Sequence, residues 1–211
     1  MSDICERLHR GAGKLPRLRA GSGMTEMPSN GVYFLFEKGE HAHGGERVVR
    51  IGTHTGDNNL RKRLEEHFHT RNKDRSIFRK HIGRCLLRRD KHPYVDLWEY
   101  DLTRRADRAS YEHLIDHGVQ KAIEDEVTCY MTENFSFSVI ELNQKADRLC
   151  FEKKLISTLS SCSDCVSSPG WLGRCHPKTV ISSKGLWNVQ GHGGKTGKTL
   201  SGEDIQNLFG T

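Results

Sequence analysis

Arg63 and His67 lie one helical turn apart and offer a fixed positive charge beside a titratable imidazole. Their segment predicts a helix that begins near Asn58 or Asn59, because asparagine side chains can accept hydrogen bonds from the free N–H groups of a first turn. The apolar stripe of this helix recurs every fourth residue, at Leu60, Leu64 and Phe68. From the edge of that stripe, both polar side chains can face a cleft at the end of the preceding strand. A solvated arginine and an ordinary flank histidine fit the same spacing.

Glu152 is a second candidate, in a segment, residues 146–159, that predicts another helix. The buried stripe of this helix consists of Leu149, Leu155, Ile156 and Leu159, and Glu152 falls in its middle. An ionised carboxylate that faces a core must be paired or bind a metal, or its pKa must rise until it is neutral. A metal-ligating role and a structural salt bridge to an arginine are both open for this side chain.

Cysteine and histidine residues suggest a zinc site near the end of the chain. A C-x-x-C pair followed by adjacent Cys and His offers four ligands, which are Cys162, Cys165, Cys175 and His176. Zinc prefers a tetrahedral set of thiolates and imidazoles, although neighbouring residues point in different directions, and plain reduced thiols are the alternative. His41 and His43 could also bind a metal, but no cysteine or carboxylate stands nearby at ligand spacing, so we expect none there.

Three short segments have the β-branched and aromatic content of strands. They are residues 31–36, 47–52 and 135–142, and the polar residues 37–46 predict a hairpin loop between the first two. Alternation places Tyr33 and Leu35 on one face of the first strand. In the second strand, Val49 and Ile51 share a face and Arg50 points the other way.

A basic segment separates the predicted helix at Arg63 from the third strand. Residues 73–91 alternate cations with an apolar stripe and predict an amphipathic helix. Its wet face holds Arg75, Arg79, Lys80, Arg84, Arg88 and Arg89. Such a face matches a phosphate backbone, and a merely solvated face is the alternative. Residues 94–103 predict an extended segment, and residues 106–131 predict an acidic helix that packs or dimerises.

Composition limits the class of protein. The 211 residues suffice for one buried domain, and the net charge of +6 favours a polyanionic partner. An odd number of cysteines, seven, argues for a reducing compartment. No apolar run approaches the roughly 18 residues that cross a bilayer. We therefore expect a soluble cytoplasmic protein with no membrane partner. It would consist of a basic N-terminal arm (1–30) that starts with a short helix, one domain (31–190) and a polar tail (191–211).

Three short motifs carry a resemblance to a known family. G-V-Y at 31–33, R-I-G at 50–52 and L-R-K-R-L-E-E-H at 60–67 are similar to the opening of the GIY-YIG nuclease domain. The resemblance implies an α+β fold, a small three-stranded antiparallel sheet flanked by helices, here with a helical insertion at about 73–131 and extended C-terminal loops. It also implies hydrolysis of phosphodiester bonds in double-stranded DNA with a divalent metal, Mg²⁺ or Mn²⁺.

The same resemblance implies roles for six residues in a one-metal hydrolysis. Glu152 would anchor the metal, and Tyr33 would position or deprotonate the attacking water. Arg50 and Arg63 would hold the phosphate oxygens, and His67 would assist proton movement. The late asparagine of the family corresponds to Asn188, a supporting ligand by resemblance and a simple turn residue otherwise.

Arg50 is a departure from the family, because it replaces the first tyrosine of the second motif. A guanidinium keeps its proton in the physiological range and cannot easily act as a base. The size, the single domain and the basic insertion resemble type II restriction endonucleases of this family, which work as homodimers because two active sites must meet two strands. A DNA-binding protein that kept the scaffold and lost cleavage is the alternative.

Overall fold

The computed structural model describes residues 2–20, 24, 26–192 and 198–210. Three strands form one antiparallel sheet in the order β2-β1-β3, with β1 at Gly31–Ala42, β2 at Gly45–Gly52 and β3 at Phe135–Glu141. The predicted α+β fold is confirmed, including the third strand. The hairpin is longer than expected, because residues 37–42 continue β1 and the turn narrows to His43 and Gly44, whose φ angles are 52° and 74°.

A β-bulge changes the direction of the side chains on β2. Leu35 lies opposite Arg50, but the next residue of β1, Phe36, lies opposite Val48, so Val49 is the extra residue. Val49 therefore joins the core that contains Leu35, and Arg50 lies on the same side of the sheet with its guanidinium 5.0 Å from the centre of the Phe78 ring. The prediction that Val49 shares a face with Ile51 is wrong for this reason.

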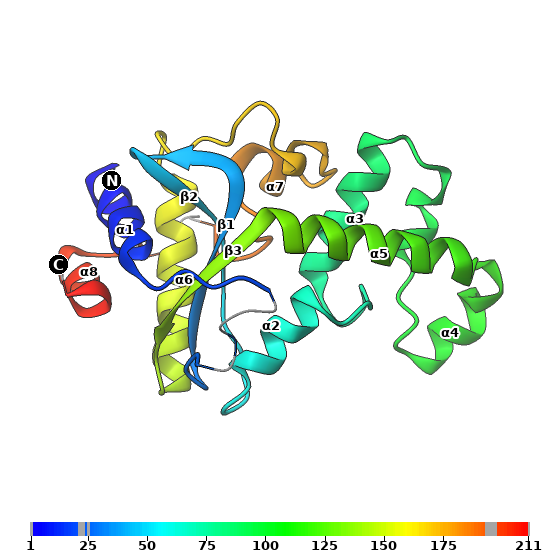
Figure 1. Cartoon of the computed structure of the whole chain (residues 1–211), viewed down its shortest axis with the longest axis horizontal. Helices are drawn as coiled ribbons and strands as arrows, with labels where there is room; N and C mark the ends of the chain where they lie inside the picture. The colour runs from blue at the N-terminus through cyan, green and yellow to red at the C-terminus, as the bar shows by residue number, and fades with distance from the viewer. Residues whose placement is uncertain (1, 21–23, 25, 193–197, 211) are drawn as a thin grey trace.

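Helices from both ends of the chain cover one face of the sheet. The core on this face joins β1 and β2 to α1 (Ser2–Lys14), α6 (Lys145–Ser161) and α8 (Gly202–Phe209). In Figure 1, α1 and α8 lie together at one end of the molecule. The expected N-terminal arm is thus partly a packed helix that buries Leu8, and the expected polar tail contains a helix that buries Ile205. Residues 1, 21–23, 25, 193–197 and 211 of these segments lie outside the described residues.

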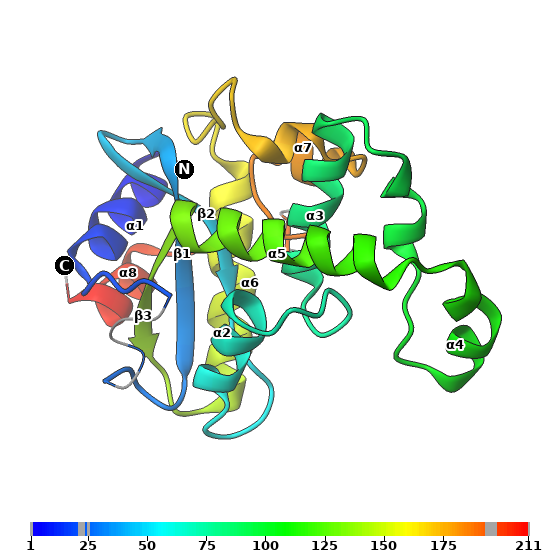
Figure 2. The same ribbon diagram turned by 45° about the vertical axis from the view of Figure 1, so that its right-hand side comes forward.

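The insertion packs against the other face. Its core joins Tyr33 and Leu35 to α2 (Leu60–Phe68), α3 (Ile77–Arg89) and α5 (His117–Asn134), and α3 to α5 extend beyond the sheet (Figure 2). The single helix predicted at 106–131 is instead α4 (Arg105–Tyr111), a 3₁₀ turn (Glu112–Leu114) and α5. The segment expected to be extended forms two 3₁₀ turns, Pro93–Val95 and Leu97–Glu99. None of the described helices combines the length and apolarity that crossing a membrane requires.

A buried carboxylate fastens the C-terminal loops to the sheet. These loops contain a 3₁₀ turn (Leu172–Cys175) and α7 (Thr179–Lys184). Glu37 Oε2 accepts hydrogen bonds from the indole N–H groups of Trp171 at 2.8 Å and Trp187 at 2.9 Å, and Tyr130 donates to Oε1 at 2.5 Å. Burial raises the pKa of Glu37, and these three donors oppose that rise. The anchored loop then crosses the outer edge of β2.

Candidate active site

The two motif glycines make room for close packing at the centre of the sheet. A Cβ at Gly31 would overlap the carbonyl oxygen of Ile140 on β3, and a Cβ at Gly52 would overlap the phenol oxygen of Tyr33. Tyr33 and Gly52 are direct partners across β1 and β2. The second glycine is therefore required by the ring of the tyrosine in the first motif.

Tyr33 and His67 form a buried hydrogen-bonded chain with the start of α3. The Tyr33 hydroxyl lies 2.8 Å from His67 Nε2, and His67 Nδ1 lies 2.6 Å from the hydroxyl of Ser76, the N-cap of α3. Burial lowers the pKa of His67 well below its usual value, and the charges of Arg63 and Arg50 lower it further. His67 is therefore neutral and joins the sheet, α2 and α3.

The loop that follows α7 closes the free edge of β2. The backbone N–H of Trp187 donates to the carbonyl of Val49 at 2.8 Å. The Asn188 side chain accepts from Ile51 N–H at 3.0 Å and donates to the Ile51 carbonyl at 2.8 Å. Asn188 thus satisfies the backbone of an edge strand beside Arg50, which makes it a positioning residue.

Arg50 lies where this loop meets the sheet. One of its terminal nitrogens donates to the Trp187 carbonyl at 2.8 Å, and the guanidinium packs on the Phe78 ring. Its Nε is buried and has no hydrogen-bond partner among the described residues. A buried donor without a partner is costly, so the position of Arg50 is maintained by its other contacts, those to Trp187 and Phe78.

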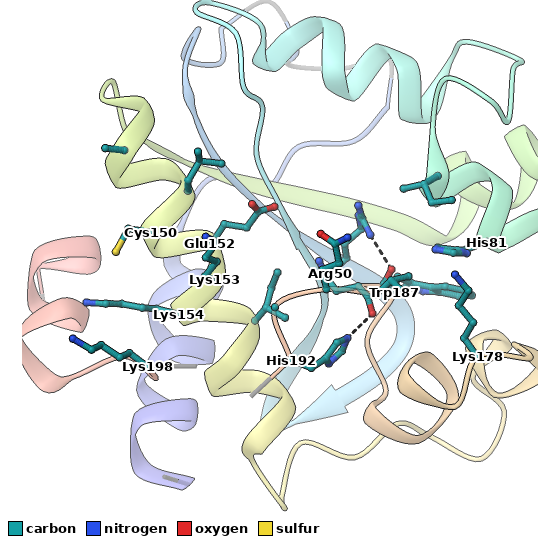
Figure 3. Close-up of a pocket in the computed structure, with 18 residues that line it drawn as sticks. Arg50, His81, Cys150, Glu152, Lys153, Lys154, Lys178, Trp187, His192 and Lys198 are labelled. Atoms are coloured by element: carbon teal, nitrogen blue, oxygen red, sulfur yellow. Dashed lines mark hydrogen bonds between the residues drawn. The ribbon is translucent and has the colours of Figure 1, made fainter. Parts of the chain in front are cut away.

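Glu152 enters the same region from α6. It lines a cleft of ≈ 1210 Å³ together with Arg50 and Asn188, and Figure 3 shows its carboxylate on the Arg50 side of α6. Burial raises the pKa of Glu152, whereas the charge of Arg50, a hydrogen bond from the Thr53 backbone and the charge of Arg63 oppose the rise. The rest of the cleft is basic, with Lys153, Lys154, Lys178 and Lys198 among its lining residues.

Arg63 is held at the outer side of this arrangement. Its guanidinium donates to Glu66 at 3.2 Å and to the carbonyl of Arg75 at 3.3 Å. Its charge acts on both Glu152 and His67. The hydrogen bonds of Arg50 and Arg63 go to groups other than Glu152, which favours a ligand role for that carboxylate over a structural salt bridge.

The GIY-YIG domain profile matches residues 1–197 of the chain. The chain belongs to the GIY-YIG family. Searches of curated proteins and of solved structures find no match. Membership in this family assigns the chain to a class of nucleases that act on DNA. The match includes α1, which the sequence placed outside the domain.

The GIY-YIG site gathers some predicted residues around the cleft and leaves others behind it. Arg50, Glu152 and Asn188 line the cleft, and Arg63 lies close enough to influence Glu152. Tyr33 and His67 are buried and are not among the residues that line the cleft. Their hydrogen bonds join the sheet, α2 and α3.

The prediction that the cations of α3 form one solvent-exposed face is largely wrong. Arg79 is buried in an ion pair with Glu124 at 2.6 Å. Lys80 donates to the Glu99 carbonyl at 2.7 Å, and Arg84 pairs with the Glu99 carboxylate. These three cations are occupied by acids and carbonyls of the insertion itself, so they cannot form an open DNA surface. The exposed cations of the predicted set are Arg75, Arg88 and Arg89.

His81 is a cleft residue that the sequence did not indicate, because it stands among cations on a helix read as a surface. Its Nδ1 accepts from Arg84 at 2.7 Å, so the proton of the neutral ring is on Nε2. His176 Nδ1 accepts a hydrogen bond from the backbone N–H of Lys178, so the proton of its neutral ring is on Nε2. That Nε2 lies 3.0 Å from His81 Nδ1 and donates to it. Burial and adjacent charges lower the pKa of His81 to about 2. The Nε2–H has no partner among the described residues.

The zinc site predicted from Cys162, Cys165, Cys175 and His176 is not assembled. Cys165 belongs to the core on the α1 side of the sheet, whereas Cys175 packs against the opposite core. His176 is held by His81 and Arg84. The sequence spacing was misleading because the chain between Cys165 and Cys175 crosses from one face of the sheet to the other.

Proposed function

We propose that this GIY-YIG domain is a divalent-metal-dependent DNA endonuclease of the restriction type, with Glu152 as the protein ligand of Mg²⁺ or Mn²⁺. The observation that carries the proposal is a partly buried carboxylate in a basic cleft, flanked by two arginines whose hydrogen bonds go elsewhere. A phosphodiester anion is the ligand that such a cleft suits.

The donor set fits a magnesium ion that is completed by substrate. Mg²⁺ commonly binds through one or two carboxylates, several waters and phosphate oxygens, and Glu152 supplies the carboxylate. A bound ion would stabilise the negative charge that develops on the phosphate and on the leaving oxygen.

Arginine and histidine donors then hold the phosphate. Arg50 and Arg63 offer positive charge near Glu152, and Arg50 and the neutral His81 stand along the cleft. Donors fixed in advance act on a developing charge without reorganisation. Tyr33, supported by His67, is proposed to position the attacking water from beneath Gly52. The exposed Arg75, Arg88 and Arg89 remain proposed contacts to the DNA backbone.

A homodimer is the proposed active form, because each chain presents one such cleft and two strands must be cut. The alternative, a DNA-binding protein without cleavage, is favoured by Arg50 alone, since arginine replaces a tyrosine of the family motif. Digestion of a supercoiled plasmid in Mg²⁺, compared with a gel shift in a chelator, separates the two. Discrete fragments or nicks support the enzyme, and a shift without cutting supports the binder.

Glu152→Gln tests the assignment of the metal ligand. We expect cleavage to fall by about 10²–10³-fold, the typical effect of one electrostatic group, while the gel shift in chelator is retained. Arg63→Ala should also lower cleavage. Asp147→Asn is the matched control, because Asp147 is an exposed acid on the same helix. Equal cutting by wild type and Glu152→Gln would refute the role of Glu152.

A further inference from the structure

A second cluster of metal-binding side chains lies away from the cleft, between α1, the hairpin turn and the loop after α6. It consists of Cys5 and His9 on α1, His43 in the turn and Cys165 in the loop. One donor atom from each lies within 4.8 Å of all the others. The chain thus brings together two sulfurs and two imidazoles from segments far apart in the sequence.

The spacing of one pair of these atoms matches the edge of a zinc tetrahedron, and the others lie within 4.8 Å. With Zn–S near 2.3 Å and Zn–N near 2.0–2.1 Å, tetrahedral ligands are separated by about 3.6 Å. Cys165 Sγ lies 3.7 Å from His9 Nε2. His9 Nδ1 lies 2.8 Å from the Cys5 carbonyl and donates to it, which leaves the lone pair on Nε2, where it now faces Val48 N–H at 3.2 Å. A carbonyl on the second ring nitrogen is the usual support of a metal-ligating histidine.

His43 reaches the cluster from the hairpin turn. His43 and Gly44 have φ angles of 52° and 74°, and a two-residue hairpin turn requires positive φ at both of its central residues. The turn brings the His43 ring to 5.0 Å from the His9 ring. Ser2 donates to Asp164 beside Cys165, which fixes α1 to the loop.

Both sulfurs of the cluster belong to cysteines that are buried and not joined in disulfides. A cysteine binds zinc as its thiolate, so binding of the ion would release the protons of both thiols.

We propose that Cys5, His9, His43 and Cys165 bind a structural zinc ion. Four protein ligands leave no open position, which is the mark of a structural site and distinguishes it from a catalytic one. The ion would fasten α1 and the loop after α6 to the hairpin. That loop leads to Trp171 and onward to the segment that closes β2, so the ion would support the frame of the cleft without taking part in cleavage.

Metal analysis of the full chain, purified without a metal-binding tag, tests the proposal. We expect equimolar zinc in the wild type, its loss in Cys5→Ser and Cys165→Ser, and its retention in Cys175→Ser, the matched control on the other side of the sheet. Replacement by Co²⁺ should give the visible absorption of tetrahedral thiolate coordination. The Co²⁺ spectrum is measured on the wild-type chain, so it does not depend on whether the variants fold.

Two further measurements sharpen the test. A strong zinc chelator should lower the melting temperature of the wild type and leave that of Cys5→Ser unchanged. Cys162 Sγ lies 3.6 Å from His43 Nε2 but outside the proposed set, so Cys162→Ser should keep zinc. Absence of zinc from the wild type, or a Cys5–Cys165 disulfide in its place, would overturn the proposal. Loss of zinc in Cys162→Ser with retention in His9→Ala would overturn the ligand set.

Discussion

Replacement of Arg79 by methionine should unfold the protein at lower temperature without a specific effect on DNA binding. Arg79 is fully buried, pairs with Glu124 at 2.6 Å, and also donates to the Thr128 hydroxyl at 2.8 Å and to the His67 carbonyl at 3.1 Å. Methionine keeps most of the side-chain length but leaves the Glu124 carboxylate buried without its partner.

The size of the effect follows from that uncompensated charge. Removal of one partner of a buried ion pair costs about 3–5 kcal/mol. In a chain of this length, 1 kcal/mol shifts the melting temperature by about 2–4 °C. The expected fall for Arg79→Met is therefore roughly 6–20 °C. Arg75→Met, a change at an exposed position just before the same helix, should alter the free energy of unfolding by no more than about 0.5 kcal/mol.

Thermal unfolding followed by circular dichroism measures both variants, and the double variant Arg79→Met/Glu124→Gln provides the internal check. Because the double variant removes the stranded charge, it should recover a large part of the stability lost in Arg79→Met. A melting temperature for Arg79→Met that matches Arg75→Met, together with weaker DNA binding at constant salt, would refute the buried pair. Arg79 would then belong to a DNA surface after all.

Two other predictions concern the cleft itself. Gly52→Ala should lower the free energy of unfolding by about 1–3 kcal/mol through overpacking against the Tyr33 ring, and it should lower cleavage. Gly13→Ala is the control, because a Cβ there meets no neighbour, and it should reduce neither stability nor cleavage. Equal melting temperatures for the two variants would contradict the packing. As the pH is lowered, cleavage should be lost before the pH reaches 4.5, the pKa of an ordinary glutamate. Burial raises the pKa of Glu152, and only the ionised carboxylate binds a metal. A raised folded-state pKa means that protonation of Glu152 favours the folded chain, so the loss of cleavage should precede unfolding measured by circular dichroism. Burial lowers the pKa of His67 well below 6.5, so His67 should add no limb to the pH profile near pH 6.5.

The sheet and the placement of Glu152 could be predicted because both depend on local pattern. The strands at 31–36 and 135–142 alternate or carry β-branched and aromatic residues, and the polar segment 37–46 predicts that the strands on either side of it pair as a hairpin. Glu152 interrupts an apolar stripe, and such an interruption is visible without any partner. The bulge at Val49 was not predictable in this way, because it changes the facing of side chains without altering composition.

The cations of α3 were misread for a physical reason. Counting positions around a helix assumes one buried face and one wet face. α3 is instead buried on most of its circumference, between α5 and the loop around Cys175. The acids that neutralise Arg79 and Arg84 are Glu124 and Glu99, which lie 45 and 15 residues away in sequence. Long-range pairing of this kind has no local signal, and the same holds for the meeting of His43 with Cys165.

The charges around Glu152 bear on how the site can hold both a cation and DNA. Arg50 and Arg63 both act on Glu152, Arg63 is also paired with Glu66, and lysines line the cleft, so the region is net positive before substrate arrives. A dication is repelled by these arginines as well as attracted by Glu152, whereas a phosphate is attracted by both arginines and by the surrounding lysines. Each phosphate that enters adds negative charge where the metal would bind. Under the proposed function, DNA would complete the site, and Arg50 would bind the phosphate, because a guanidinium does not give up its proton and cannot serve as the base.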